Sequence, residues 1–180
     1  MSEEILIAAD HAGFEMKGKL ESELERLGYK VKDFGTNSPE STDYADYAHP
    51  LAKDISEGKH KRGILLCGTG LGMSYVANRY PHVRAAVTWS PEVAQLARQH
   101  NDANVLVLPA RQVSDQEAVE IMHKWLTTPF DGGRHERRIE KIERADKKKA
   151  VTKAVKRTVK KAVRKAVKTA KRRIGKRKAK

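Results

Sequence analysis

The sequence predicts an α/β fold: a doubly wound, Rossmann-like sheet of five parallel strands with helices on both faces, followed by a basic C-terminal tail. Two observations lead to it. Five short apolar runs recur along the first 110 residues, and segments with apolar side chains at helical spacing separate them. Parallel strands need crossover connections of about a dozen residues or more, and helices of about 10 to 15 residues supply them. Right-handed crossovers of this kind cover both faces of the sheet.

The predicted strands are short apolar runs bounded by polar or turn residues. They cover residues 5–9, 29–35, 63–67, 84–89 and 104–109. The run at 29–35 alternates Val31 and Phe34 with charged residues, which is typical of a strand near the edge of a sheet. The run at 63–67, GILLC, is apolar throughout, which indicates a strand buried on both faces.

The predicted helices follow the strands and have recognisable ends. Gly28 and Gly58 close the first two as C-terminal caps, and Pro91 stands in the tolerated first turn of the fourth. The residues Ser41, Thr42 and Asp43 can cap the second helix. The helical spacing runs from Phe14 to Leu27, from Tyr44 to Ile55, from the glycine loop to about Tyr80, onward from Ser90-Pro91-Glu92, and from Asp115 to Thr127.

The charge of the chain is divided between two regions. Residues 145–180 carry 18 of the 37 Lys and Arg residues and one acid, Asp146, whereas residues 1–144 are slightly acidic. We therefore predict a globular domain over 1–144 and a basic low-complexity tail over 145–180, disordered or partly helical. A single cysteine, no signal peptide and no apolar run of about 18 residues favour a cytoplasmic protein without a membrane span.

Polar residues follow the strands at the carboxyl ends, where sheets of this class bind ligands. The candidates are Asp10-His11, residues 33–36, Cys67 to Gly72, Trp89-Ser90 and Pro109 to Arg111. A further polar run, Arg98-Gln99-His100-Asn101-Asp102, comes after the fourth strand and its helix. We expect His11, His100, the Asp10 carboxylate and the Cys67 thiol to converge on one crevice.

The glycine loop over residues 68–72 follows a strand and opens a helix, where backbone N–H groups and the helix dipole can hold an anion. It lacks the Lys-Ser/Thr of a P-loop and the full spacing of a dinucleotide fingerprint. Tight packing is the alternative explanation of its glycines. The positive end of the helix would favour the thiolate form of Cys67. Its position alone favours an unreactive, buried strand-end cysteine, because free cysteine is among the most buried residue types.

Two further patterns have a functional and an ordinary interpretation. Arg134 and Arg138 are four residues apart and suit a phosphate, or they belong to a solvated helix and pair with Glu136 and Glu140. A zinc site formed by Cys67, His11 and His100 has no close ligand pair to support it, so no metal is predicted. The other histidines are expected on the surface or on helices, and they are His49, His60, His82 and His123.

Residues 5 to about 144 resemble the type B ribose-5-phosphate isomerases of the ribose/galactose isomerase family. Five motifs in the family's order carry this resemblance: AADHAGFEMK, DFGTNSPESTDYADYA, GILLCGTGLGMSYVAN, ARQHNDANVL and FDGGRHERRIE. The resemblance implies interconversion of ribose 5-phosphate and ribulose 5-phosphate in the pentose phosphate pathway, without metal or cofactor. It also implies a homodimer, or a pair of dimers, with active sites at the subunit interface.

The resemblance implies which residues carry the proton transfer. Cys67 corresponds to the general base, which removes the proton next to the carbonyl and returns it to the neighbouring carbon through an enediolate. Thr69 corresponds to a hydroxyl that helps protons move between the oxygens. The backbone N–H groups that face the developing oxyanion belong to Gly68, Thr69, Gly70, Leu71 and Gly72.

Substrate binding and ring opening are implied in the same way. His100 corresponds to the acid that opens the furanose ring, and Asp10 and Asn101 correspond to residues that hold sugar hydroxyls. The phosphate contacts correspond to His11, Arg111, Arg134 and Arg138. Relatives that isomerise galactose 6-phosphate or allose 6-phosphate share the fold, so a six-carbon sugar phosphate is an alternative substrate.

Residues 145–180 depart from the family pattern. Residues 150–169 repeat as four-residue units of a small residue, Val and mostly basic residues, a period that winds around a helix and makes a poor coiled coil. The tail resembles those of nucleoid-associated proteins in composition, which predicts salt-sensitive, sequence-tolerant binding of nucleic acid. The alternatives are an extension without a partner and contact with an anionic membrane surface. A binding protein that reuses an inactive isomerase domain is the rival to an enzyme.

Overall fold

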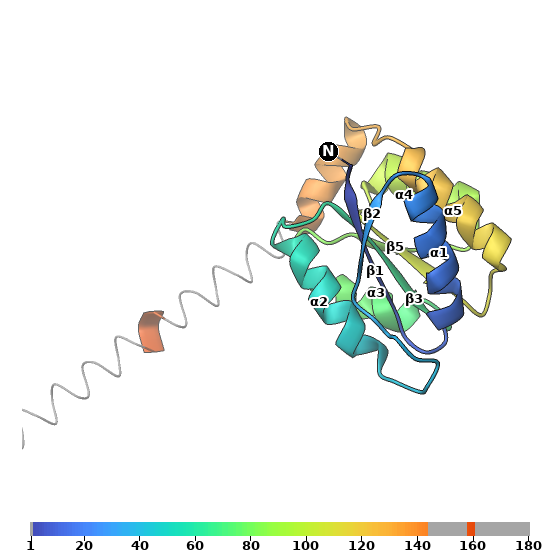
Figure 1. Cartoon of the computed structure of the whole chain (residues 1–180). Helices are drawn as coiled ribbons and strands as arrows, with labels where there is room; N and C mark the ends of the chain where they lie inside the picture. Colours follow the sequence, from blue (N-terminus) through green and yellow to red (C-terminus); the bar gives the residue numbers. More distant parts are fainter. Residues whose placement is uncertain (1, 144–157, 161–180) are drawn as a thin grey trace, which may run out of the picture. The chain divides into compact units, whose positions relative to one another are not determined.

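The computed structural model describes residues 2–143 and 158–160 (Figure 1). The chain divides into two compact units, Met1–Arg137 and Arg138–Lys180, and the sheet belongs to the first. Residues 134–143 and 158–160 are helical. The rest of the basic tail lies outside the described residues, so both a domain boundary at residue 144 and the state of the tail stay predictions.

The sheet has the predicted five parallel strands. Its spatial order is β2-β1-β3-β5-β4, with β2 at one edge as its alternating pattern indicated. The strands are β1 Glu4–Ala9, β2 Lys30–Asp33, β3 Arg62–Cys67, β4 Ala85–Val87 and β5 Val105–Pro109. The fully apolar runs form β1, β3 and β5 in the centre, where both faces are covered.

Five helices connect or follow the strands. They are α1 Phe14–Arg26, α2 Tyr44–Ser56, α3 Leu71–Ala77, α4 Pro91–Asn101 and α5 Asp115–Thr127. The hydroxyl of Ser90 caps α4 by accepting a hydrogen bond from the Val93 N–H at 3.4 Å, ahead of Pro91. Ser114 and Glu117 form a capping box at the start of α5. Asp43 stands at the N-cap of α2, but its side chain makes no capping bond.

The helix α3 is shorter than the sequence predicts, because it ends at Ala77 and not near Tyr80. Asn78 accounts for the difference. Its side-chain amide donates to the Ser74 and Ala85 carbonyls at 3.0 and 2.8 Å, and its Oδ1 accepts from the Ala85 N–H at 2.9 Å. These bonds tie the end of α3 to β4 and replace a further helical turn.

Helices cover both faces of the sheet (Figure 1), and an apolar layer on each face holds the first unit together. On one face α1, α4 and α5 pack against the strands around the fully buried Trp125, whose indole N–H donates to the Ala103 carbonyl. On the other face α2 and α3 pack against residues such as Leu65 and Val107. In the part of the chain that the structure describes, no helix combines the length and apolar character needed to cross a membrane.

Candidate functional site

Asp10 and Cys67 lie on adjacent strands at the carboxyl edge, the side of the sheet where the strands end. Ala9 is paired with Leu66, and the Asp10 N–H donates to the Leu66 carbonyl at 3.1 Å. Asp10 is 6% exposed and Cys67 is 4% exposed. The helix α1, which follows β1, packs on one face of the sheet, and the helix α2, which precedes β3, packs on the other. This is therefore the topological switch point, where doubly wound sheets bind ligands.

The glycine loop leads from Cys67 directly into α3. Gly70, the N-cap of α3, has φ +75°, and a Cβ there would lie 3.0 Å from a Val87 methyl carbon. Glycine therefore suits both the backbone conformation and the space. Thr69 is exposed, and its Oγ1 accepts from the Leu71 N–H at 3.4 Å. The first N–H groups of a helix have no partner within it, so this loop offers donors beside the thiol.

Arg111 and His11 lie on the same edge. The Arg111 side chain covers Gly68, where an added Cβ would meet the Arg111 Cδ at 3.3 Å, and the Arg111 N–H donates to the Gly68 carbonyl at 3.1 Å. His11 Nδ1 accepts a hydrogen bond from the Thr42 N–H at 3.3 Å. The neutral ring then carries its proton on Nε2, which leaves that atom as a donor.

The predicted convergence of His100 with Cys67 is wrong for a single chain. His100 and Asn101 are the last residues of α4, and the Asn101 carbonyl accepts from Arg84 Nε at 3.0 Å. Arg84 directly precedes β4, so the end of α4 lies at the amino edge, where the strands begin. Because a crossover helix runs antiparallel to its strands, its C-terminus faces the edge opposite Cys67. The length of β5 alone separates the two edges by roughly 13 Å.

The same geometry excludes, within one chain, the zinc site of Cys67, His11 and His100 that was considered from the sequence. Within one chain Cys67 and His11 stand at the carboxyl edge and His100 at the amino edge, so the three cannot bind one ion.

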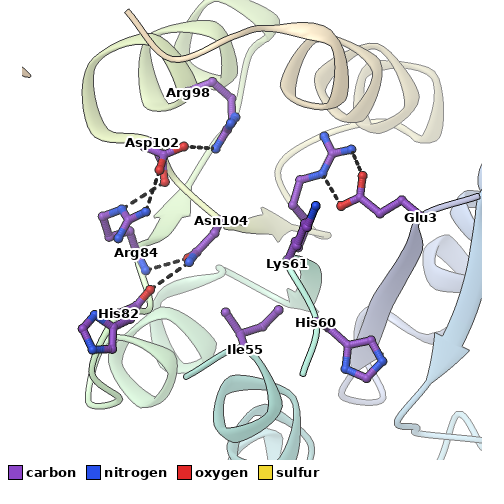
Figure 2. Close-up of a pocket in the computed structure, with 10 residues that line it drawn as sticks. Glu3, Ile55, His60, Lys61, His82, Arg84, Arg98, Asp102 and Asn104 are labelled. Atoms are coloured by element: carbon purple, nitrogen blue, oxygen red, sulfur yellow. Dashed lines mark hydrogen bonds and ion pairs between the residues drawn. The ribbon is translucent and has the colours of Figure 1, made fainter. Parts of the chain in front are cut away.

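Three residues at the end of α4 and before β4, which we call the α4 clamp, are drawn in Figure 2. They restrict the polypeptide on both sides of His100 and Asn101, the last residues of α4. The clamp consists of Arg84, Arg98 and Asp102. The Asp102 carboxylate accepts from Arg84 Nη2 and Arg98 Nη1, each at 2.8 Å, and Arg84 Nε also reaches the Asp102 carbonyl at 3.0 Å. Asp102 ends α4 with φ +44°. Paired guanidinium contacts of this kind restrict the chain on both sides of the turn.

The clamp lines a cavity of about 470 Å³ at the amino edge. Glu3 stands on its opposite side (Figure 2). Its carboxylate accepts from Arg62 Nε at 3.0 Å and from Arg62 Nη2 at 2.5 Å. The Arg62 guanidinium holds the pKa of the Glu3 carboxyl below its ordinary value, against the opposing effect of burial. Arg62 also donates to the Leu126 carbonyl at 2.8 Å.

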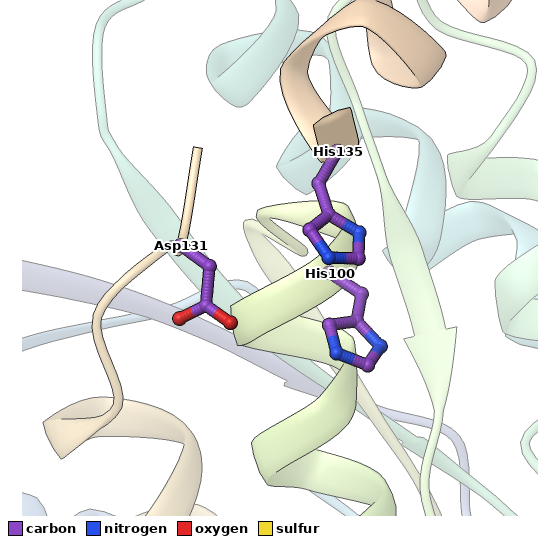
Figure 3. Close-up of side chains that lie close together, drawn as sticks. All are labelled: His100, Asp131 and His135. Carbon is purple, nitrogen blue, oxygen red and sulfur yellow. The ribbon is translucent and has the colours of Figure 1, made fainter. Parts of the chain in front are cut away.

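Arg134 and His135 lie beside His100. The His135 ring stacks on that of His100 with centroids 4.3 Å apart and planes at 2° (Figure 3). Arg134 Nε donates to His135 Nε2 at 3.3 Å. Arg134 therefore stands at the amino edge. Arg138 lies on the same helical segment over 134–143 but belongs to the second unit, so its phosphate contact stays a prediction.

Sequence patterns missed several residues around His100. Arg98 and Asp102 have the i,i+4 spacing of an ion pair, but nothing in the sequence places Arg84 against them. Asp131 and His135 lie in the motif FDGGRHERRIE, but the sequence analysis assigned a function only to its residues Arg134 and Arg138. Such groupings depend on loops that meet only in the folded chain.

Of the four other histidines, His49, His82 and His123 lie on the surface or on helices, as predicted. His60 does not: it lies between α2 and β3, and its side chain is only 15% exposed. His49 is on α2 with Nδ1 2.8 Å from the Tyr80 hydroxyl, and His123 is on α5 beside Glu23. His60 Nε2 lies 2.7 Å from a Glu4 carboxylate oxygen, and His82 is exposed.

Comparison with known proteins gives one consistent result. The profile of the family described as Ribose/Galactose Isomerase matches residues 5–142. Ribose-5-phosphate isomerase B of Escherichia coli strain K12 is 44% identical over 138 residues, which cover 77% of this chain and 93% of the relative.

Solved structures agree with the sequence comparison. A ribose 5-phosphate isomerase of Thermotoga maritima is 52% identical with a TM-score of 0.77, over 80% of this chain and 99% of that one. Ribose-5-phosphate isomerase B of Mycoplasma genitalium, solved with bound ribulose-5-phosphate, is 42% identical with a TM-score of 0.79, over 82% of this chain and 98% of that one.

Proposed function

The chain belongs to the ribose/galactose isomerase family, and we propose that it interconverts D-ribose 5-phosphate and D-ribulose 5-phosphate, a step of the pentose phosphate pathway. One observation carries the proposal: the only cysteine stands at the switch point of the sheet, before a glycine loop and beside Asp10, His11 and Arg111. The relative from Mycoplasma genitalium, solved with ribulose-5-phosphate bound, has the same fold.

The reaction needs a base and a site for negative charge, and the carboxyl edge offers both. The Cys67 thiolate removes the proton from C2 of the open-chain aldose, the electron pair moves to the carbonyl oxygen, and an enediolate forms. The thiol then returns a proton to C1, which gives the ketose. Backbone N–H donors of residues 68–72 stabilise the enediolate oxygens, and one such donor is worth about 3 kcal/mol in comparable sites. Thr69 moves a proton between the two oxygens.

Substrate binding divides between the two edges. At the carboxyl edge Asp10 holds a sugar hydroxyl, and the His11 Nε2–H and the Arg111 guanidinium bind the phosphate. At the amino edge His100 opens the ring, Asn101 holds a hydroxyl and Arg134 contributes to the phosphate. Arg138 is a further proposed phosphate contact. Binding energy from the phosphate positions the reacting carbons against Cys67.

The complete site requires two copies of the chain. Since Cys67 and His100 lie at opposite edges, one copy supplies the carboxyl edge and its partner supplies His100, Asn101 and Arg134. Four large apolar side chains on α3, on the loop before α4 and on α4 are exposed and suit the contact between copies. They are Leu71, Tyr75, Trp89 and Leu96, between 47% and 65% exposed. A surface of this kind is typical of homodimers.

An isomerase assay tests the function directly. The full chain is expected to convert ribose 5-phosphate to ribulose 5-phosphate, and Cys67→Ala to lose activity by about 10²- to 10⁴-fold, the usual contribution of a general base. His123→Gln, which changes a histidine that contacts Glu23 and is not one of the proposed site residues, serves as the control. Activity that survives in Cys67→Ala contradicts the role of Cys67 as the base. An inactive wild-type chain favours the alternative hypothesis, a binding protein that reuses an inactive isomerase domain.

The same assay addresses the substrate. Allose 6-phosphate and galactose 6-phosphate are run beside ribose 5-phosphate, because one extra carbon is a modest discrimination for a pocket. We expect the highest kcat/KM for the five-carbon substrate. If kcat/KM is higher for either six-carbon sugar phosphate, that sugar phosphate is the principal substrate in place of ribose 5-phosphate.

We also propose that the basic tail binds polyanions, with nucleic acid as the principal partner. The support is its sequence: 18 basic residues and one acid over 145–180, without an aromatic side chain to stack on bases. Binding of this kind depends on phosphate contacts and falls steeply with salt. A cytoplasmic location, with association to the nucleoid, would follow.

Retention on duplex DNA tests the tail. The full chain is expected to be retained at about 50 mM salt and released by about 200 mM, whereas a chain ending at Arg144 flows through. The truncated chain should keep its isomerase activity. The proposal is contradicted if retention does not depend on the salt concentration, or if the truncated chain is retained as well. Lost activity would mean that the tail serves the fold or the dimer.

A further inference from the structure

We propose that His100, Asp131 and His135 form a binding site for a divalent transition-metal ion such as Zn²⁺, and that an ion bound there withdraws His100 from the isomerase reaction. The binding of the ion rests on the geometry of these three residues. The inhibition rests, in addition, on the proposed function.

Three separate parts of the chain bring the donors together (Figure 3). His100 stands at the end of α4, Asp131 in the segment after α5, and His135 in the helical segment over 134–143. The Asp131 N–H donates to the Gln99 carbonyl at 3.1 Å, which joins the segment to the last turn of α4. The His135 N–H donates to the Gly132 carbonyl, also at 3.1 Å. The three residues are thus positioned by backbone contacts.

The donor set suits a transition metal. One potential ligand atom from each of His100, Asp131 and His135 lies within 4.8 Å of the other two. Two imidazoles and one carboxylate are common ligands of Zn²⁺ and related ions. Donors in a tetrahedral site with bonds of about 2.0 to 2.1 Å stand roughly 3.3 Å apart. The donor atoms must therefore approach one another by at most about 1.5 Å when the ion binds.

The burial of the residues shows which side chains can move. His135 is buried at 6% exposure and serves as the fixed ligand, whereas Asp131 is exposed and His100 partly exposed. Imidazole binds a metal in the plane of its ring, so His100 must turn out of the parallel stack with His135 to reach the same ion. The Arg134 contact with His135 Nε2 opposes binding, which makes the site a reversible one.

The remainder of the chain offers little competition for the ion. Residues 145–180 contain no histidine or cysteine, and within one copy of the chain Cys67 and His11 lie at the other edge of the sheet. Among residues 2–143 and 158–160, no second cluster of three such ligands is found. Cys67 is the one strong alternative ligand, and it can be removed by substitution.

Cobalt binding tests the site without reference to activity. The untagged full chain with Cys67→Ser is titrated with Co²⁺, followed by visible absorption and by NMR of the histidine rings. We expect one ion per chain, with the resonances of His100 and His135 affected first. Asp131→Asn and His135→Gln should each weaken binding by tenfold or more, and His123→Gln should leave it unchanged. Asp131 is exposed, so its variant tests the site even if His135→Gln does not fold. Equal binding by Asp131→Asn, or primary shifts at other histidines, overturns the site.

Zinc inhibition tests the consequence. Zn²⁺ is expected to inhibit the wild-type isomerase reversibly, with release by a chelator, and Asp131→Asn should need at least ten times more Zn²⁺. If Zn²⁺ inhibits Asp131→Asn as strongly as the wild type, the inhibiting ion binds elsewhere, with Cys67 as the first alternative, and the proposed inhibition through His100 is overturned. Co²⁺ binding at the three residues without inhibition by Zn²⁺ overturns it as well. A chain with no isomerase activity refutes the proposed function, while the cobalt titration still decides the site.

Discussion

The two edges of the sheet differ in how their functional groups are held. At the carboxyl edge Cys67, Asp10 and the glycine loop follow directly from paired central strands, so the sheet itself positions them. At the amino edge His100 and Asn101 stand at the end of a helix and depend on side-chain contacts from the α4 clamp and His135. Backbone pairing between strands therefore positions the groups at the carboxyl edge, whereas contacts between side chains position those at the amino edge.

This difference shows that a single copy of the chain carries two half-sites that face away from each other. Neither half contains both the proposed base and the proposed ring-opening acid. Catalysis should therefore be a property of the assembly, and each half should fail in its own way when it is altered.

Mixing two inactive variants gives the largest effect. Cys67→Ala and His100→Gln are each expected to be nearly inactive. Random pairing makes half of the dimers mixed, each with one intact site, so co-folded mixtures should recover roughly a quarter of the wild-type activity. The measurement is the isomerase rate of the mixture against each variant alone. A mixture as inactive as its parents would mean that Cys67 and His100 act within one chain.

Gly70→Ala addresses the backbone of the carboxyl edge. With φ +75° and Val87 3.0 Å from the new Cβ, it should lower the free energy of unfolding by about 1 to 3 kcal/mol. Gly18→Ala is the matched control, because Gly18 lies inside α1 with no atom within 4 Å of an added Cβ. It should stabilise by about 0.5 to 1 kcal/mol. Denaturant titration compares them, and equal effects would contradict the account of the loop.

Asp102→Asn tests the α4 clamp as a positioning element. It keeps the size of the side chain but removes the charge that Arg84 and Arg98 hold. We expect kcat to fall about tenfold, as is typical of lost positioning, with KM changed by less than about twofold. Circular dichroism verifies the fold. An unchanged kcat would show that the clamp serves stability alone.

Glu3→Gln is expected to have the smallest effect and to depend on pH. The folded pKa of Glu3 is lowered by Arg62, so the ion pair stabilises the chain above the unfolded pKa. That stability is lost as the pH falls through the folded pKa. At pH 7 the substitution should cost about 1 kcal/mol in this partly buried pair, and at a pH well below the folded pKa the variant and wild type should converge. Denaturant titrations at both pH values measure this, and a gap that persists in acid contradicts it.

The sequence by itself determined the fold class, the place of every strand, and the residues of the carboxyl edge. Apolar runs such as GILLC mark central strands, and the residue after the end of a parallel strand must lie at the carboxyl edge of the sheet. The motifs also identified the family. These features depend on local periodicity and on neighbours along the chain, which the sequence states directly.

Only the tertiary structure decided what surrounds His100, because the contacts of Arg84 with the end of α4 and of His135 with the His100 ring come from other segments of the chain. The end of α3 depended on bonds from Asn78 to β4. The clamp and the His100–Asp131–His135 cluster unite residues up to about 35 positions apart in sequence. Contacts of this kind arise from packing between elements, and no period or spacing along the chain encodes them.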